Sequence, residues 1–214
     1  MSSLIPRVIV AGLGAAVSPV AITLLITVMF RDHARRNSLF FLLGFTVTLV
    51  AIGLVAVFLF HTADSGGTGK IDDYIDMGLG VLCLAAVPLV ARKKPKQSKE
   101  DVEKDLKASR ALSLGVFAML VNSSTMVIYI AGVHEIIAAK LGKADGILAM
   151  AVLTLLTLVT LIIPIVIYFI FPKQSQRVLQ SVRTWLQNHM KEIGMAILVI
   201  FGVYLLVKGI VAVA

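Results

Sequence analysis

Residues 12–30 of the chain read GLGAAVSPVAITLLITVMF, and this stretch decides which kind of fold the sequence can adopt. It belongs to a run between Arg7 and Arg31 that contains no charged residue. A helix needs about 20 apolar residues to cross the hydrocarbon layer of a bilayer, which is about 30 Å thick. The run is therefore long enough to be a membrane span, and the pair Ser18-Pro19 interrupts it near its middle.

Apolar runs of similar length recur along the whole chain. Apolar residues make up 58% of the 214 residues and charged residues 15%, whereas a soluble domain has about 45–50% and about 25%. Six segments reach or approach the length of a span: 4–30, 38–60, 74–91, 111–133, 145–171 and 193–213. These features predict an all-α, polytopic membrane protein with six transmembrane helices.

Basic residues gather in three connections between these segments. The loops 31–37, 92–110 and 172–192 contain three, eight and four of the 20 Lys and Arg residues. With six spans these are the first, third and fifth connections, so they lie on one face of the membrane. The positive-inside rule makes that face cytoplasmic. We therefore expect a multi-pass protein of the inner (plasma) membrane with both termini outside, and the net charge of +8 needs no nucleic-acid partner.

Three spans on each side of the loop 92–110, a basic cytoplasmic linker, give the two halves opposite orientations. Residues 1–91 would form the first half and residues 111–214 the second. The halves share a weak pattern, a Leu-Gly pair followed by a polar break: Leu13-Gly14 before Ser18-Pro19, and Leu114-Gly115 before Asn122-Ser123-Ser124. Because inverted repeats are common in secondary transporters, the pattern predicts two inverted three-helix repeats with broken helices 1 and 4.

Both polar breaks fall in the middle of their spans, where a new half-helix would begin. Proline suits the first helical position but not the interior, and serine before it is a good N-cap. The N-terminus of a half-helix has free N–H groups and a partial positive charge, which favour an anion or a carbonyl-rich group. We therefore predict a substrate site at the midplane, formed by Ser18, Pro19, Asn122, Ser123 and Ser124. A simple helix kink and hydrogen bonds between helices would account for the same residues without a site.

Other polar residues are weaker candidates for function. Thr154 and Thr157 could line a path beside the broken helices, although threonine often bonds to its own helix. Asp76, His134 and Glu135 lie near the predicted outer ends of their spans and could carry a coupling proton; a hydrated outer rim is the alternative. No carboxylate lies at mid-membrane and no catalytic, zinc or nucleotide motif occurs. We therefore expect no metal site, no cofactor and no enzyme activity.

Residues 173–190 have a different pattern from the spans. Their apolar residues recur with helical spacing, while basic and amide residues lie largely on the other side: Val178, Val182, Trp185, Leu186 and Met190 against Lys173, Arg177, Gln180, Arg183 and Gln187. This pattern predicts an amphipathic surface helix within the second repeat. We expect it to lie in the cytoplasmic headgroup layer, with Trp185 as an interfacial anchor.

The paired motifs and the basic central loop resemble those of the LysE superfamily of small exporters. Within it, the chain looks most like the actinobacterial GAP/Sap group, the glycolipid- and sulfolipid-addressing proteins. Three stretches carry the resemblance: residues 12–19, residues 114–124 and the tail from Arg183 to Gly209. LysE-type relatives often have Pro-Gly-Pro and Asn-Pro-Lys where this chain has Val17-Ser18-Pro19 and Asn122-Ser123-Ser124, so amino-acid export is not implied. The GAP/Sap group implies a part in moving cell-envelope lipids, alongside a larger lipid exporter.

These observations leave three hypotheses for the function. In the first, the protein is a transporter or flippase-like protein for a polar-headed or anionic cell-envelope (glyco)lipid. In the second, it is a non-transporting accessory subunit of a lipid-export machine. In the third, it is a LysE-type exporter of a small solute or metal ion. The expected partners are membrane lipids and a larger lipid exporter, with a homodimer as a further candidate.

The predicted topology can be tested by cysteine labelling in a chain whose native Cys83 is replaced by serine. Cysteines placed at Lys96 and Gly67 are expected to react from opposite sides of the membrane, because the first lies in a basic loop and the second in the outer loop 61–71. A membrane-impermeant maleimide applied to intact cells and to inverted vesicles measures this. Labelling of both positions from the same side would contradict the six-span topology.

Overall fold

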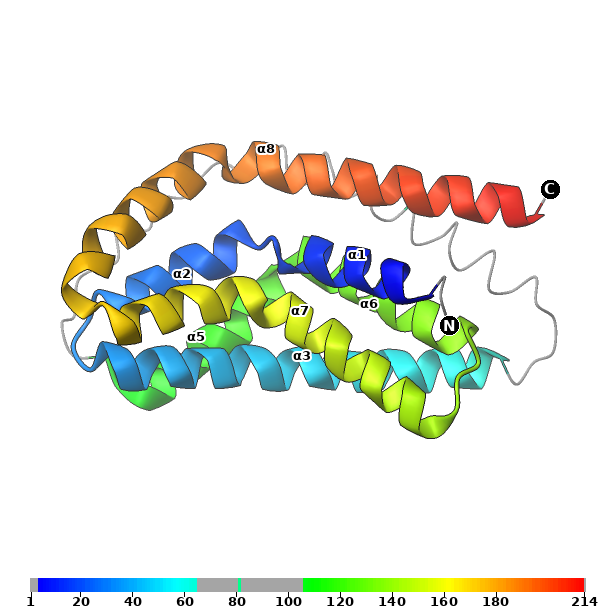
Figure 1. The fold of residues 1–214 in the computed structure, drawn as a ribbon, viewed down its shortest axis with the longest axis horizontal. Helices are drawn as coiled ribbons and strands as arrows, with labels where there is room; N and C mark the ends of the chain where they lie inside the picture. The colour runs from blue at the N-terminus through cyan, green and yellow to red at the C-terminus, as the bar shows by residue number, and fades with distance from the viewer. Residues whose placement is uncertain (1–3, 65–80, 82–105, 214) are drawn as a thin grey trace.

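The computed structural model describes residues 4–64, 81 and 106–213, and each regular element in these ranges is an α-helix. The helices follow one another in this order (Figure 1): α1 (Leu4–Ala16), α2 (Pro19–Met29), α3 (Ala34–Asp64), α5 (Ala108–Val121), α6 (Ser123–Ala138), α7 (Lys143–Ile170) and α8 (Pro172–Val213). Apart from position 81, the predicted third span, 74–91, lies outside the described residues.

Two of these helices are long and apolar enough to cross a membrane alone. They are residues Ala34–Phe60 of α3 and Lys143–Ile170 of α7, close to the predicted spans 38–60 and 145–171. The pairs α1–α2 and α5–α6 are bent at a short break, by 53° and 72°, and each pair meets the same test as one broken span. An all-helical membrane protein with two clear spans, or up to four in the described ranges, is thus confirmed, and six spans stay a prediction.

The break between α1 and α2 follows from Pro19. Proline has no N–H to donate and its ring clashes with the preceding turn, which weakens a helix interior and favours the end of α1 before this residue. The same ring suits the first position of a new helix, and α2 begins there. The hydroxyl oxygen of Ser18 accepts a hydrogen bond of 3.2 Å from the N–H of Ala21 and so caps α2. The predicted break in the first helix is therefore present, with the predicted cap.

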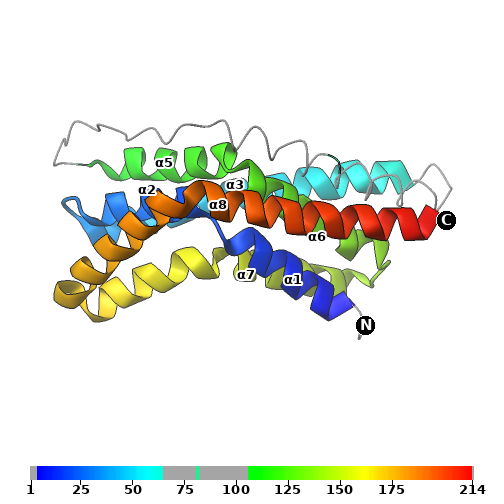
Figure 2. The same cartoon turned by 90° about the horizontal axis from the view of Figure 1, so that it is seen from above.

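The helices run roughly along one long axis, and the connections between them gather at its two ends (Figure 1). The α2–α3 turn, the start of α5 and the α7–α8 junction lie at one end. The N-terminus, the α6–α7 turn and the C-terminus lie at the other, as Figure 2 also shows. The basic segment 31–37 and the start of segment 172–192 therefore share an end, as the predicted topology requires. The orientation of that end in a membrane stays a prediction.

The end of the bundle that holds the basic segment 31–37 is called the basic end. A buried amide group links the helices there. The Nδ2 group of Asn37 donates to the carbonyl oxygen of Asp32 at 2.9 Å and to that of Leu106 at 2.8 Å. These bonds join the turn after α2 to the chain that enters α5. Because α5 begins at Ala108, the last residues of the predicted linker 92–110 are helical, and its residues before 106 lie outside the described part.

Helix α8 is continuous from Pro172 to Val213. The predicted surface helix 173–190 and the predicted span 193–213 therefore belong to one element, without a loop between them. The first part of α8 runs in a different direction from the rest, which extends along the bundle toward the C-terminus (Figure 1). A change of direction at this end is what a segment leaving a headgroup layer for a membrane span would need.

The first part of α8 has apolar side chains on two faces, one exposed and one packed against the rest of the protein. Val178, Val182 and Trp185 are exposed, whereas Leu179 and Leu186 are buried. The sequence pattern places Leu186 on the same face as Trp185, but the structure turns it toward the protein because the helix packs on the bundle through its leucines. Anchoring by Trp185 in a headgroup layer stays a prediction.

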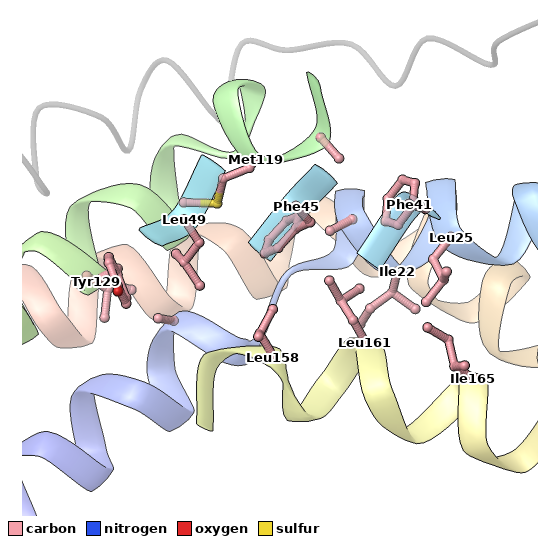
Figure 3. Packing of buried hydrophobic residues seen from close by; sticks show 14 of the residues in the cluster. Ile22, Leu25, Phe41, Phe45, Leu49, Met119, Tyr129, Leu158, Leu161 and Ile165 are labelled. Carbon is pink, nitrogen blue, oxygen red and sulfur yellow. The ribbon is translucent and has the colours of Figure 1, made fainter. Parts of the chain in front are cut away.

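One face of helix α3 contributes buried side chains to the apolar core (Figure 3). Its buried side chains lie between α5 on one side and the helices α2 and α7 on the other. The labelled members of this cluster are Ile22, Leu25, Phe41, Phe45, Leu49, Met119, Tyr129, Leu158, Leu161 and Ile165. Since they come from both halves of the sequence, the two halves share one core.

The contact between α3 and α5 is made by backbone against backbone. A β-carbon added at Gly115 would collide with the carbonyl oxygen of Phe41, and one added at Gly44 with the carbonyl oxygen of Leu112. Small residues allow helix backbones to approach this closely in membrane proteins. Gly115, a member of the second Leu-Gly pair, therefore has a packing role.

The substitution Gly115→Ala is expected to destabilise the protein by about 1–3 kcal/mol, the usual cost of overpacking. Gly146→Ala is the matched control, because nothing lies within 4 Å of its β-carbon position. Alanine is also the better helix former by about 1 kcal/mol, so the control should be neutral or slightly stabilising. Unfolding of the purified proteins in detergent measures both, and equal stabilities would contradict the close contact.

Candidate functional site

The break between α5 and α6 has a different origin from the proline break. Asn122 separates the two helices, with φ −85° and ψ 70°, outside the helical region. Its N–H donates to the carbonyl oxygen of Met119 at 3.2 Å, and its own carbonyl accepts from the N–H of Met126 at 3.1 Å. The side chain of Asn122 does not cap α6. Its amide group contacts other side chains instead.

The two breaks meet in a buried hydrogen-bond network. The Nδ2 group of Asn122 donates to the hydroxyl oxygen of Ser18, 104 positions earlier in the chain, and to the hydroxyl oxygen of Thr125 at 2.8 Å. The Thr125 hydroxyl donates in turn to the backbone carbonyl oxygen of Ala15 at 2.9 Å. These four residues are named the Ser18–Asn122 network here. The structure thus brings together the two breaks that the sequence predicts to meet.

The Ser18–Asn122 network is buried, and the side-chain amide of Asn122 is fully hydrogen-bonded. The exposed fraction is 2% for Ser18, 4% for Asn122 and 1% for Thr125. Both hydrogens of the Asn122 amide are used, and its Oδ1 accepts a hydrogen bond of 3.1 Å from Ser124. An unpaired polar group in an apolar interior costs about 1–3 kcal/mol. The network therefore joins the two breaks through hydrogen bonds between their side chains.

The other residues predicted for the midplane site lie beside the network. Pro19 is buried at the start of α2, and Ser123 and Ser124 are half-buried in the first turn of α6. Ser18 caps α2, but Asn122 gives α6 no side-chain cap. The first turn of a helix has N–H groups without partners inside the helix, and such a terminus favours an anion. Substrate binding by these residues stays a prediction.

The two threonines predicted to line a path bond to their own helix, α7. The Thr157 hydroxyl donates to the carbonyl oxygen of Leu153 and the Thr154 hydroxyl to that of Met150, both at 2.8 Å. Thr154 also shares a hydrogen bond of 3.0 Å with the hydroxyl of Tyr129. The alternative that the sequence left open, bonding within the helix, is thus present for both residues. Thr154 in addition links α7 to α6.

Two of the three candidates for proton coupling lie on α6, and Asp76 lies outside the described residues. His134 and Glu135 are buried rather than exposed at a hydrated rim. Glu135 accepts a hydrogen bond of 3.3 Å from the guanidinium group of Arg7 on α1. The ring of His134 meets that of Phe60 edge-on, with 5.0 Å between the ring centroids. A role in proton coupling stays a prediction.

Sequence reasoning missed Thr125, Arg7 and Tyr129. Thr125 stands three residues after Asn122, the spacing at which an N-cap residue and the third helical residue meet, and this spacing could have indicated it. Arg7 and Glu135 have opposite charges near the same predicted face, and intramembrane charges usually pair. Tyr129 has no comparable signal, because a tyrosine in an apolar helix equally suits the membrane interface.

The substitution Thr125→Val tests whether the network stabilises the fold. Valine keeps the shape but removes the hydroxyl, so an N–H of Asn122 and the carbonyl of Ala15 lose a partner, at an expected cost of about 1–3 kcal/mol. Thr157→Val is the matched control, since Thr157 is also buried but donates to its own helix. We expect the control to cost less, because the carbonyl that it leaves keeps its backbone hydrogen bond within α7. Unfolding in detergent measures both, and equal costs would contradict a network between helices.

Neither the curated proteins nor the solved structures include a match to this chain. The family model described as "Sap, sulfolipid-1-addressing protein" matches residues 8–211, a range that contains both helix breaks. This match confirms the resemblance to the GAP/Sap group, while the link to the LysE superfamily rests on the resemblance alone. The chain therefore belongs to the Sap, sulfolipid-1-addressing protein, family.

Proposed function

We propose that this protein moves a polar-headed or anionic cell-envelope lipid through the membrane, as a transporter or flippase-like protein. The family description, sulfolipid-1-addressing, supports a lipid as the cargo. The observation that carries the proposal is the Ser18–Asn122 network, which joins two helix breaks inside the apolar bundle. Unbroken spans satisfy their own backbones in lipid, and irregular backbone at membrane depth is tolerated where it is buried in protein or lines a cavity. Two such breaks in contact therefore favour a site at this place.

The packing of the helices supports two inverted three-helix repeats. A bent pair followed by a long helix occurs twice, as α1–α2 with α3 and as α5–α6 with α7. Helix α3 packs along α5, and helix α7 packs along α1, so each long helix contacts the first arm of the other pair. If the two halves are exchanged, each long helix still packs along the first arm of the other bent pair. A pseudo-two-fold axis through the Ser18–Asn122 network would require this symmetry.

In the proposed mechanism, the headgroup of the lipid replaces hydrogen bonds of the network. Its oxygens accept from the Asn122 amide and from the first-turn N–H groups of α6, whose N-terminus favours negative charge. Asn122 then releases Ser18, and the arms of the two bent pairs separate at their breaks. Thr154 and Thr157 lie along the proposed path on α7. The acyl chains stay in contact with exposed apolar side chains, and no covalent step, metal or cofactor takes part.

We further propose that the basic end of the molecule faces the cytoplasm and that both ends of the chain lie outside. Segment 31–37 lies at the basic end and segment 172–192 starts there, which supports this orientation under the positive-inside rule. The exposed side chains of Val178, Val182 and Trp185 support the placement of the first part of α8 in the cytoplasmic headgroup layer.

A second candidate function is that of a non-transporting accessory subunit of a lipid-export machine. The observation in its favour is that the side-chain amide of Asn122 has all its hydrogen-bond partners within the protein, as expected for a structural contact. In this case the two breaks fix the shape of a surface on which a larger exporter docks. The two functions differ in whether the chain moves lipid by itself.

The substitutions Pro19→Ala and Asn122→Leu are expected to lower delivery of the lipid to the cell surface at least about tenfold. The first removes the cause of one break and the second removes the amide that joins both, a loss of one or two hydrogen bonds. Ser113→Ala is the control, because Ser113 is exposed and bonds to its own helix. Surface lipid is extracted and quantified in cells that lack their own copy, at matched protein levels. Unchanged delivery in both variants would contradict the proposal.

Liposomes that contain the purified chain separate the two candidate functions. A transporter moves a fluorescent anionic lipid between leaflets, so its reduction by external dithionite becomes complete, and Asn122→Leu stops this movement. An accessory subunit leaves the inner leaflet protected in liposomes, although Asn122→Leu still blocks delivery in cells. Movement that is the same in empty liposomes would overturn the transporter function.

A further inference from the structure

An ion pair joins α1 and α6, which are one arm of each bent pair. The Nη1 group of Arg7 on α1 donates to Oε2 of Glu135 on α6 at 3.3 Å, across 128 positions of the chain. Arg7 lies two residues after Ile5, where the first broken span starts, and Glu135 lies three residues before the end of α6 at Ala138. Both residues are thus about one helical turn from the same end of the bundle, the end opposite to the basic segments.

The two partners of this pair differ in exposure. The side chain of Arg7 is 47% exposed, whereas that of Glu135 is 6% exposed. A buried carboxylate needs a charged or hydrogen-bonding partner to offset the cost of leaving water, and Arg7 supplies one. A guanidinium group has five N–H donors, and in the part of the chain that the structure describes its hydrogen-bond partner is Glu135. The other donors are therefore available on the exposed side.

The surface next to Arg7 is apolar and leads toward the first break. Val10, Leu13 and Val17 follow Arg7 at spacings of three, three and four residues, so they lie on neighbouring faces of α1, and all three are exposed. The neighbour of Glu135 in the chain, His134, is also buried, and its ring packs edge-on against Phe60. A molecule that approaches Arg7 from the exposed side thus meets a cation at the end of the helix and an apolar stripe beside it.

We propose that Arg7, held in place by Glu135, binds the sulfate or phosphate group of an anionic lipid at the end of the α1–α6 contact. The planar guanidinium group matches such oxygens with two parallel hydrogen bonds, and the acyl chain lies along Val10, Leu13 and Val17. Glu135 is a positioning residue, because its carboxylate fixes the guanidinium from the buried side. This inference rests on the proposed function and names the chemical class of its cargo.

The test compares binding of two soluble lipids to the full chain in a neutral detergent. Dioctanoyl phosphatidylglycerol is the anionic probe and dioctanoyl phosphatidylcholine the zwitterionic one, and affinities are measured by titration calorimetry. Arg7→Gln should weaken binding of the anionic probe about tenfold, the effect of one or two charge-assisted hydrogen bonds, and leave the zwitterionic probe unchanged. Arg7→Lys should retain part of the preference, since lysine keeps the positive charge but cannot donate two parallel hydrogen bonds to one anionic group. Lys143→Gln is the control, because Lys143 is an exposed cation at the same end.

The variant Glu135→Gln separates this proposal from a purely structural ion pair. Glutamine keeps a hydrogen-bond acceptor for Arg7 but removes the negative charge that competes with the lipid, so the anionic probe should bind several-fold tighter. If the pair is only structural, both Arg7→Gln and Glu135→Gln lower the melting temperature and neither changes the preference for the anionic probe. That result would overturn the proposal. Inorganic sulfate that binds as tightly as the anionic lipid would overturn the assignment to a lipid.

Failure of this inference is distinguishable from failure of the proposed function. Binding of the probes needs no lipid movement, whereas delivery in cells does. A preference for the anionic probe that does not depend on Arg7, together with delivery that depends on Asn122, would reject the Arg7 site and keep the function. A preference that depends on Arg7, with delivery unaffected by Asn122→Leu, would keep the site and reject the function.

Discussion

Backbone that leaves the helical pattern inside an apolar bundle must find polar partners, and this constraint organises the structure. A span interrupted at Ser18-Pro19 exposes N–H and carbonyl groups that hydrocarbon cannot satisfy. The second break, at Asn122, supplies what the first one needs, because its amide reaches Ser18 and its neighbour Thr125 reaches the carbonyl of Ala15. The two breaks therefore have to lie side by side. Their contact fixes how α1, α2, α5 and α6 cross, and the long helices α3 and α7 pack around that crossing.

Much of this arrangement is visible in the sequence, because it depends on local chemistry. Proline has no N–H and suits the first position of a helix, and serine is a good N-cap, so the pair Ser18-Pro19 indicates where α2 begins. The long spans are recognisable because hydrocarbon requires their length, and they agree with α3 and α7 within a few residues. Asn122 has a weaker signal, since asparagine tolerates many conformations, and the internal similarity of the two halves is what indicates it.

The rest depends on contacts between distant parts of the chain, for which a single sequence holds no signal. The partner of the Thr125 hydroxyl is a backbone carbonyl at Ala15, and every residue has such a carbonyl. For Thr154 and Thr157 the sequence likewise leaves the hydrogen-bond partners open. Their spacing indicates that they share a face of the helix, but not that both hydroxyls donate to backbone carbonyls within α7. Leu186 belongs to the apolar face of an isolated amphipathic helix, and only the packing of α8 on the bundle turns it inward.

The distribution of polar and apolar contacts along α1 and α6 bears on how the arms can move. Between the Ser18–Asn122 network and the Arg7–Glu135 pair, the two helices approach each other at small residues, since a β-carbon added at Gly132 would lie 3.1 Å from the β-carbon of Ala11. Contacts between small residues bury less apolar surface than contacts between large ones, and polar contacts hold the two arms at both levels. Contacts between large leucine side chains would not respond to a headgroup, because they contain no hydrogen bond that a headgroup could replace. In the proposed mechanism, a polar headgroup replaces the hydrogen bonds of this contact one by one, so that the arms separate without the loss of large apolar contacts.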